Sequence, residues 1–257
     1  MTRPVFLCDP DVAREAQSQG VLVLGGREGH HAADVRRLRR GEEVDVVDGH
    51  GLRLRCTVTD LGRGQVVLDV RDAVREPVAT PRVTVAQALI KHDAADRALS
   101  AMTEVGVDEV LPWSAERSVV TWDAARQQRA LARWRADVAE AAKQSRRSWV
   151  PVVPAPVTTA ELANRVGEAD VALLLDREAP EPLPDDHVRH ACDVLVVVGP
   201  EGGMTEREVT LLTEVGARPV HLGPTVLRSA TAGAVAAAVV LSRTGRWLSG
   251  QAEVPAG

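Results

Sequence analysis

The chain has 257 residues, of which 45% are hydrophobic and 26% charged, so it can form one large globular domain or two smaller ones. Its N-terminus lacks the basic segment and apolar run of a signal peptide, and the apolar stretch at 232–241 is too short for a membrane span, which needs about 20 residues. We therefore expect a cytoplasmic protein with no membrane partner. The net charge of −5 argues weakly against a nucleic-acid partner, although the distribution of charge decides more than its total.

The first part of the chain reads mainly as strands. Residues 44–48 lead into a turn at 49–51, and residues 52–58 then alternate between apolar and polar, as a half-buried strand does. A second turn at 62–64 precedes the strand 65–70, and one short helix is predicted at 31–39. We predict a small β-barrel domain over residues 1–75.

After a linker with two prolines at 75–81, predicted strands alternate with predicted helices. The strands are 83–90, 171–175, 194–198 and 220–222, and the helices are 94–105, 124–147, 205–216 and 230–242. Thr205 and Glu208 have the spacing of a capping box at a helix start. This alternation predicts an α/β domain with a mainly parallel sheet over residues 76–250, followed by a disordered tail at 251–257.

Three of the predicted strands end in segments suited to ligand binding. The turn Gly199-Pro-Glu-Gly-Gly203 joins a strand to a helix, and glycines there let backbone amides approach a ligand. Residues 221–233 and 173–178 also follow strands, and ligands of parallel sheets bind at carboxyl ends of strands. The glycine turn matches neither the Rossmann nor the Walker pattern. Spacing alone leaves a tight turn without a ligand about as plausible as a binding loop.

A metal site is not expected. Asp185, Asp186, His187 and His190 lie close together in sequence but lack a third well-spaced ligand group, so a plain polar loop is favoured. The three cysteines are far apart and form no CxxC pair, so scattered buried thiols are favoured over a disulfide or zinc site.

The ordered set of motifs resembles one known family. The turn at 199–203 and the segment Leu222-Gly-Pro-Thr-Val-Leu-Arg-Ser-Ala-Thr-Ala232 resemble the two C-terminal signatures of the RsmE family, which methylates N3 of a uridine in 16S ribosomal RNA. Residues 30–41 and 47–49 resemble its N-terminal PUA-like domain. Further matches follow in order at 88–91, 104–106, 116–120 and 140–146.

The resemblance implies a fold, a cofactor and an assembly. The fold is an α/β domain of the SPOUT class with a deep trefoil knot, preceded by a small PUA-like β-barrel that binds RNA. The knot loops hold S-adenosylmethionine, and the enzyme is a homodimer acting on 16S rRNA of the small ribosomal subunit. The implied cofactor-binding residues are Leu174, Leu175, Asp176, Gly199, Pro200, Glu201, Gly202, Gly203, Leu222, Gly223, Pro224, Leu227, Arg228, Ser229 and Ala230.

Two residues are the candidates for catalysis. The proton on N3 of uracil must leave before or during methyl transfer, and a guanidinium suits the negative charge that develops, so Arg228 is the first candidate. Glu201 could accept the proton or a hydrogen bond from the cofactor, although solvent could equally be the base. The family usually has a glutamate where this chain has Ala230, so no role of that carboxylate is carried over.

Contacts with RNA phosphates are expected from clustered cations. One cluster lies at 36–40, and a second lies on one stripe of the long helix, at Arg129, Arg133, Lys143 and Arg147. A solvated helix face explains either cluster about as well. The full expected set is Arg36, Arg37, Arg39, Arg40, Lys91, Arg117, Lys143, Arg146 and Arg147.

Three alternatives stay open. The chain could be a SPOUT enzyme that methylates another RNA base or a ribose 2′-hydroxyl. It could be a non-catalytic RNA-binding factor in ribosome assembly, an idea to which Ala230 gives some room. It could also be an α/β enzyme that acts on a small molecule and has no affinity for ribosomal subunits.

Overall fold

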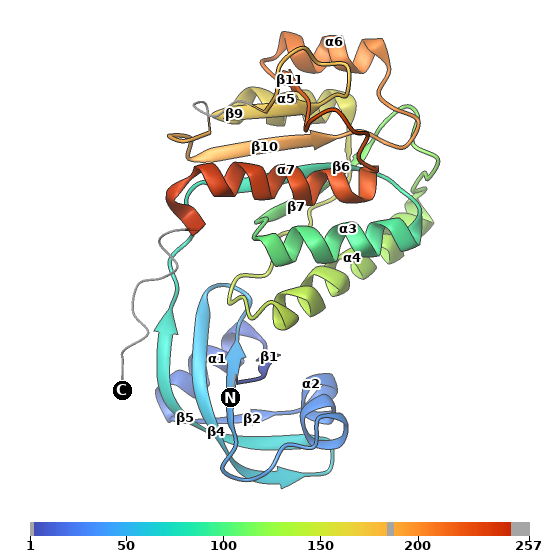
Figure 1. Ribbon diagram of the computed structural model, residues 1–257. Helices are drawn as coiled ribbons and strands as arrows, with labels where there is room; N and C mark the ends of the chain where they lie inside the picture. The colour runs from blue at the N-terminus through green and yellow to red at the C-terminus, as the bar shows by residue number, and fades with distance from the viewer. Residues whose placement is uncertain (1–2, 184–187, 248–257) are drawn as a thin grey trace. The chain divides into compact units, whose positions relative to one another are not determined.

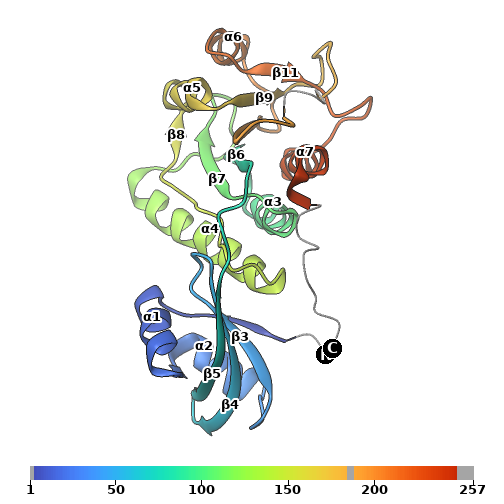
Figure 2. The same ribbon diagram turned by 90° about the vertical axis from the view of Figure 1, so that its left-hand side faces the viewer.

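The computed structural model describes residues 3–183 and 188–247, and its contacts divide the chain into two compact units. The first unit runs up to Val78 and also contains Ala142–Val150, and the second contains the remainder. Figures 1 and 2 show the elements of each unit from two directions. In the part of the chain that the structure describes, no helix is long and apolar enough to cross a membrane.

The first unit is a strongly curled, mainly antiparallel sheet with short helices packed against it. Its five strands follow the order β1-β3-β4-β5-β2, and only the pair β1–β3 is parallel. The elements are β1 (Val5–Leu7), α1 (Pro10–Gln19), β2 (Val21–Leu24), α2 (Gly26–His30), a π-helical turn (His31–Val35), β3 (Glu43–Val47), β4 (Leu52–Gly62) and β5 (Gln65–Arg75). Shifts of register between β4 and β5, at 55/56 and 58/60, are β-bulges of the kind that bend a sheet around a core.

Alternation in β4 is as the sequence predicts, because Leu52, Leu54 and Cys56 are buried on one face. Helix α1 was not predicted. Its start is nevertheless encoded locally, since the Asp9 side chain accepts a hydrogen bond from the Asp11 amide and Pro10 occupies the first turn.

The helix predicted at 31–39 is wrong in its bounds. Helical structure begins at Gly26 and ends with the π-helical turn at Val35. Arg37 then adopts a left-handed φ of 57°, and this reversal directs Leu38 into the core, where it is 6% exposed.

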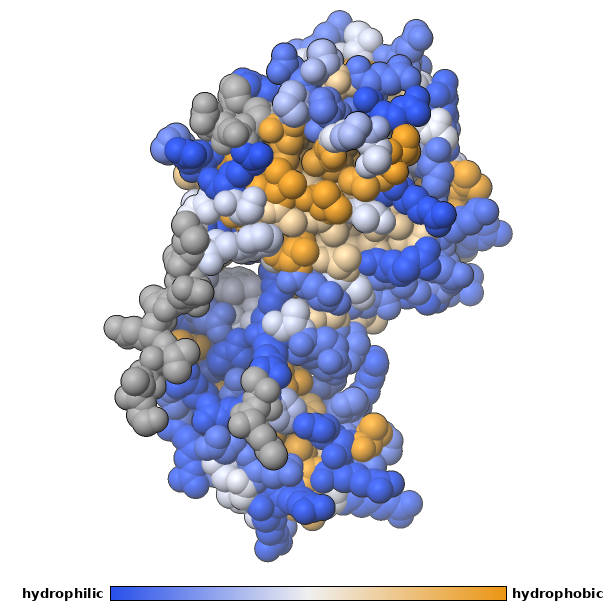
Figure 3. Space-filling view, viewed as in Figure 1, coloured by the Kyte–Doolittle hydropathy of each residue, from blue (hydrophilic) through white to orange (hydrophobic). Residues whose placement is uncertain are grey.

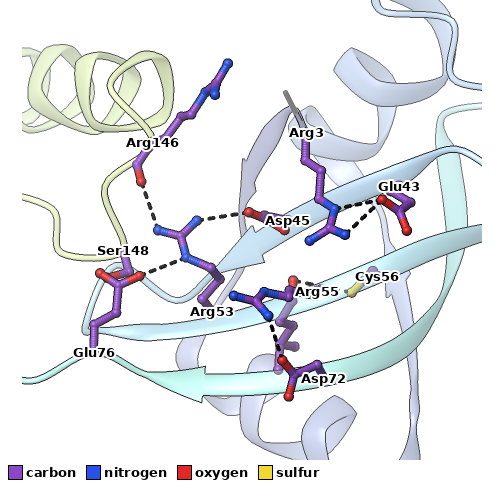
Figure 4. Close-up of polar contacts among 11 residues, drawn as sticks. Arg3, Glu43, Asp45, Arg53, Arg55, Cys56, Asp72, Glu76, Arg146 and Ser148 are labelled. Atoms are coloured by element: carbon purple, nitrogen blue, oxygen red, sulfur yellow. Dashed lines mark hydrogen bonds and ion pairs between the residues drawn. The ribbon is translucent and has the colours of Figure 1, made fainter. Parts of the chain in front are cut away.

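The segment 142–150 is fastened to the first unit by a polar network around Arg53 (Figure 4). The Arg53 guanidinium donates to Glu76 Oε1 at 2.8 Å, to Asp45 Oδ2 at 3.2 Å and to the Arg146 carbonyl oxygen at 2.9 Å. The Ser148 hydroxyl donates to the other carboxylate oxygen of Glu76 at 2.5 Å. The Arg53 and Asp45 side chains are only 13% and 15% exposed, so the ion pair between them is largely shielded from water. A domain boundary drawn by sequence position at residue 75 takes no account of this distant segment.

The second unit is a parallel sheet with helices on both faces. Its six strands follow the order β11-β9-β10-β6-β7-β8. The elements are β6 (Arg82–Ala88), α3 (His92–Val105), β7 (Glu109–Ser114), α4 (Ala124–Gln144), β8 (Val157–Thr158), α5 (Thr159–Glu168), β9 (Val171–Leu175), β10 (Asp193–Val198), α6 (Glu206–Glu214), β11 (Arg218–Val220), α7 (Ser229–Arg243) and a 3₁₀ turn (Gly245–Trp247). Helices α5 and α6 cover one face, and α3 and α7 cover the other (Figure 2).

Several predicted elements of this unit are confirmed. Strand β9 has the predicted bounds, and α3 ends at Gly106, which has the left-handed φ of 114° expected of a C-terminal cap. The capping box of α6 is present in both directions between Thr205 and Glu208. The strand predicted at 220–222 is shifted, because β11 ends at Val220 and the following residues form a loop.

Small residues bring α7 close to its neighbours. A side chain at Gly233 would place its Cβ 2.9 Å from Met102 Sδ on α3, closer than real contacts allow, and 3.1 Å from Val85 Cγ1 on β6, which is tighter than most contacts. Gly233 therefore lets α7 pack closely against α3 and β6.

Arg246 fastens the end of the described chain to the second unit. Its guanidinium forms two hydrogen bonds with the Asp108 carboxylate, at 2.5 and 2.9 Å, and donates to the carbonyl oxygens of Pro81 and Gly106. The two charged side chains are 13% and 19% exposed, so this forked ion pair is largely protected from solvent.

We expect Arg246→Ala to lower the free energy of unfolding by about 2–4 kcal/mol, because it leaves the Asp108 carboxylate without its cation. Urea denaturation measures the change. Arg246→Lys keeps the charge but not the fork and should recover only part of the loss. Arg14→Ala removes an exposed ion pair and is the matched control. Equal losses of unfolding free energy in Arg246→Ala and Arg14→Ala would contradict a stabilising role of the ion pair between Arg246 and Asp108.

Candidate functional site

A cavity of about 1170 Å³ opens at the carboxyl edge of the parallel sheet. The strand register aligns this edge, since Val198 pairs with Gln87, Val197 with Leu174, and Val220 with Leu175. The loops that follow β9, β10 and β11 therefore begin side by side and form the wall. Figure 3 shows apolar side chains gathered on this face of the second unit and bordered by hydrophilic ones.

Most of the residues expected to contact a cofactor line this cavity. They are Leu175, Asp176, Gly199, Pro200, Glu201, Gly202, Gly203, Leu222, Gly223, Leu227, Arg228, Ser229 and Ala230. Leu174 and Pro224 are exceptions. Leu174 is fully buried in the core between the sheet and helices α5 and α6, because neighbouring strand residues point to opposite faces. Pro224 is exposed and lies outside the lining.

The turn after β10 depends on its glycines. A Cβ on Gly199 would lie 3.0 Å from Met204 Cγ, and a Cβ on Gly202 would lie 3.3 Å from the Arg117 carbonyl oxygen. Gly203 has a left-handed φ of 72°, and its amide donates to the Pro200 carbonyl oxygen at 2.9 Å, which closes the turn. Bare backbone thus forms this part of the wall, as the sequence predicts.

A buried carboxylate anchors that turn from beneath. Glu208 is 1% exposed, and its Oε2 accepts hydrogen bonds from both the amide and the hydroxyl of Thr205. Its other oxygen, Oε1, accepts from the Glu116 amide at 2.8 Å and from the Thr159 hydroxyl at 3.2 Å. Four donors to one carboxylate offset the cost of burying its charge and join α5, α6 and the loop after β7. The neighbouring Arg117 then reaches the turn and donates to the Met204 carbonyl oxygen at 3.3 Å.

The third loop is ordered by His221. Its ring Nδ1 accepts a hydrogen bond from the Gly223 amide at 3.0 Å, and Gly223 has a left-handed φ of 104°. The amide of Asp176 donates to the Val220 carbonyl oxygen at 3.0 Å, which links the first loop to the third. His221 was not among the predicted site residues, because its contact depends on how the loop folds.

The cavity wall carries charges of both signs. The candidate catalytic residues Arg228 and Glu201 are both exposed on it, and in the described ranges neither forms a hydrogen bond or ion pair through its side chain. Arg97 also lines the cavity and was not predicted, because no sequence pattern shows that one residue of α3 reaches this edge.

The residues expected to contact RNA fall in both units. Arg36, Arg37, Arg39 and Arg40 are all exposed on the first unit, where Arg40 forms an ion pair with Asp60. Arg146 is exposed and Arg147 half-buried in the segment 142–150 of that unit. In the second unit Lys91 is exposed at the start of α3, and Arg117 is exposed on the cavity wall.

Lys143 corrects the sequence-based expectation. Its side chain is only 6% exposed, and its ammonium contacts Glu28 Oε1 at 2.8 Å within the first unit. Lys143 therefore fastens the end of α4 and is not a free cation for RNA. The helical stripe could not reveal this, because Glu28 is 115 residues away in sequence. Arg133 of the same stripe forms ion pairs with Asp96 and Asp137.

The described residues contain no group of three or more His, Cys, Asp or Glu side chains that could hold a metal. Of the polar loop considered above, residues 185–187 lie outside the described ranges, as does the tail predicted to be disordered. Burial raises the pKa of the Cys8 and Cys56 thiols to about 12, so neither is a nucleophile at neutral pH. Cys192 is exposed and Cys8 is half-buried, which corrects the expectation of buried thiols for all but Cys56.

Comparisons with known proteins agree with this architecture. Residues 77–241 match the model of an RNA methyltransferase domain, and residues 24–71 match that of an RNA methyltransferase PUA domain. Ribosomal RNA small subunit methyltransferase E of Mycobacterium bovis is 45% identical over 231 residues, 88% of each chain. The protein of that name from Synechocystis is 32% identical over 89% of this chain and 75% of its own.

A solved structure supports the same assignment. Ribosomal RNA small subunit methyltransferase E from Neisseria gonorrhoeae, bound to S-adenosyl methionine, superposes with a TM-score of 0.83. It is 27% identical and covers 94% of this chain and 98% of its own. The chain thus combines an N-terminal PUA-like domain with a C-terminal α/β domain of the SPOUT class, and it is similar to these relatives in both sequence and fold. The chain belongs to the ribosomal RNA small subunit methyltransferase E family of RNA methyltransferases.

Proposed function

We propose that this protein transfers a methyl group from S-adenosylmethionine to N3 of a specific uridine in 16S ribosomal RNA of the small subunit. The observation that carries the proposal is the cavity at the carboxyl edge of the sheet, where three loops present bare backbone, apolar side chains and an exposed guanidinium together. The names of the relatives described above state a methyltransferase acting on ribosomal RNA of the small subunit, and this supports the proposed substrate.

The cavity suits S-adenosylmethionine in size and chemistry. Its volume of about 1170 Å³ exceeds that of a typical small-molecule pocket, which leaves room for a second reactant. Val198, Val220 and Leu227 offer an apolar wall for an adenine ring. Asp176, Glu201 and Glu206 supply carboxylates for hydroxyl and ammonium groups. When bound, this cofactor supplies an electrophilic methyl group on a sulfonium centre.

Arg228 and Glu201 are the residues to which we assign the chemistry at the base. The Arg228 guanidinium faces the same cavity as the cofactor loops, and we propose that it stabilises the negative charge that spreads over O2 and O4 as the N3 proton leaves. The Glu201 carboxylate can accept that proton, which leaves a lone pair on N3 to form the new bond to the methyl carbon. The bond from that carbon to sulfur would break at the same time, and its electron pair would stay on sulfur as a neutral thioether. Ala230 lines the cavity but has no group that can move a proton.

RNA contacts on the first unit would deliver the target base. We assign this role to the exposed arginines at 36–40 and to Arg146, which is exposed in the same unit. A paired or stacked uridine would have to leave its stack to enter the cavity. Likeness to the family supports a homodimer, and the ribosomal substrate supports a cytoplasmic location.

The direct test is methyl transfer to purified small ribosomal subunits, followed by nucleoside analysis of the RNA. The expected product is 3-methyluridine. A methylated ribose or another base would replace the proposal by a different RNA methylation. The absence of both methylation and cofactor binding would favour a non-catalytic assembly factor.

Gly202→Val tests the cofactor loop. A Cβ at this position already lies 3.3 Å from the Arg117 carbonyl oxygen, so the branched side chain must push the turn out of place or fill the cavity. We expect the affinity for S-adenosylmethionine, measured by calorimetry, to fall at least about tenfold. Gly167→Val, at an exposed helix position with nothing closer than 3.9 Å, is the matched control. Unchanged affinity in Gly202→Val would remove this loop from the site.

Substitutions at Arg228 and Glu201 separate their roles. Arg228→Ala should lower kcat by about 10²–10³-fold, because it removes the group that stabilises the uridine anion. Glu201→Gln should lower kcat, and the rise of kcat with pH that reports ionisation of a carboxyl group should disappear from the rate–pH profile. Arg218→Ala, at an exposed position on β11, should leave kcat unchanged. An unaltered profile in Glu201→Gln would instead assign the proton to solvent.

Charge reversal at Arg36, Arg37, Arg39 and Arg40 tests the RNA surface. The variant should bind small subunits more weakly, and the slope of log affinity against log salt should become shallower because fewer phosphate contacts release counterions. Filter binding over a range of salt concentrations measures both effects. Its affinity for S-adenosylmethionine should equal that of the parent, since the cavity residues are intact. Normal methylation of intact subunits would show that RNA binds elsewhere.

A further inference from the structure

A fully buried glutamine lies beneath the cavity and holds two of its loops together. Gln87, the penultimate residue of β6, is 0% exposed in the middle of the parallel sheet. Its side-chain amide Nε2 donates to the Ser229 hydroxyl oxygen at 3.0 Å. That hydroxyl donates in turn to the Gly199 carbonyl oxygen at 2.7 Å. One hydroxyl thus connects a central strand, the turn after β10 and the first residue of α7, segments separated by up to 142 residues in sequence.

The direction of these bonds fixes their chemistry. The Ser229 hydroxyl has one proton, which it gives to Gly199, so it can only accept from Gln87. If the glutamine amide were flipped, its oxygen would face the lone pairs of the Ser229 oxygen, whose only proton already goes to Gly199. Only one orientation of the Gln87 amide is therefore compatible with these contacts. The second proton of Nε2 points to the Ala88 carbonyl oxygen at 3.3 Å. A carboxylate or an apolar side chain at residue 87 cannot supply this donor.

The remaining oxygen of Gln87 shows that packing alone did not select this residue. Gln87 Oε1 is buried and has no hydrogen-bond partner among the described residues. It lies where a Cβ on Gly233 would approach to 3.5 Å, in a region otherwise formed by Met102 and Val85. An unpaired buried oxygen costs about 1–3 kcal/mol. An apolar side chain of the same size would avoid this cost, so the donor on the other side of the amide must supply a compensating benefit.

We infer that Gln87 is a positioning residue for the methyl-donor site, acting through Ser229 to hold the turn at 199–203 against the start of α7. This inference rests on the proposed function. Gly199 and Ser229 both line the cavity, whereas Gln87 does not reach it. Without the bridge, each loop keeps its local bonds but the separation between the loops is no longer fixed. Preorganised walls lower the cost of ordering a site when its ligand binds, and small displacements are expensive for group transfer.

Gln87→Met tests the bridge with an apolar residue of similar length. We expect the dissociation constant and the KM for S-adenosylmethionine to rise about 10–100-fold, while the KM for the ribosomal subunit stays within about twofold. Thr84→Val is the matched control, because Thr84 is 2% exposed on the same strand and does not line this cavity. It should leave both KM values unchanged. Thermal unfolding of each variant shows whether the fold is retained.

Ser229→Ala breaks the same bridge from the other side and keeps a small residue in a helix of small residues. If the bridge acts as one unit, Gln87→Met combined with Ser229→Ala should bind the cofactor no more weakly than the worse single variant. If the losses of cofactor affinity in the two single variants multiply in the double variant, or if both KM values rise equally, Gln87 only supports the fold. KM values in Gln87→Met equal to those of the parent would also overturn the inference. Failure of the unsubstituted protein to bind S-adenosylmethionine would instead refute the proposed function.

Discussion

The parallel register of β6, β9, β10 and β11 is the constraint on which the site depends. Main-chain hydrogen bonds between these strands align Val198 with Gln87 and Val220 with Leu175, so the chain leaves the sheet repeatedly at one edge. A shift by one residue would turn the buried side chains of β10 toward the wrong face and would also move the start of the glycine turn. Side chains do not create this convergence; the sheet does, and the loops then need only modest adjustment to share one cavity.

That adjustment is made by buried polar groups and not by apolar packing. Glu208 accepts four hydrogen bonds and fixes the far end of the glycine turn, while the Ser229 hydroxyl holds its near end. Each such group is costly to bury and stabilises only one arrangement of its partners. Apolar contacts between loops survive small displacements of one loop against the other. A carboxylate that accepts four directional hydrogen bonds loses some of them when the loops shift. Hydrogen bonds therefore fix both ends of the glycine turn where backbone forms the cavity wall.

Local signals were predictable from the sequence, and long-range ones were not. The capping box of α6 and the bounds of β9 depend on residues a few positions apart, so pattern alone identifies them. Burial of Lys143 against Glu28, and the bridge from Gln87, depend on partners more than 100 residues away. The bounds of the helix predicted at 31–39 were wrong for the same reason, since the burial of Leu38 in the core is a tertiary effect. Glycine turns were recognised because backbone geometry restricts the residue type directly.

The arrangement of arginines explains how an acidic chain can act on RNA. At the amino edge of the sheet, Arg82 and Arg165 share the buried carboxylate of Glu109. At the carboxyl edge, within the described residues, Arg97 and Arg228 line the cavity without a carboxylate partner. Charges separated by more than about 8–10 Å are screened at physiological salt, so the net charge of −5 has little influence inside the cavity. The unpaired guanidiniums at this edge support the proposed contact with a uridine anion, while the paired ones hold the opposite edge together.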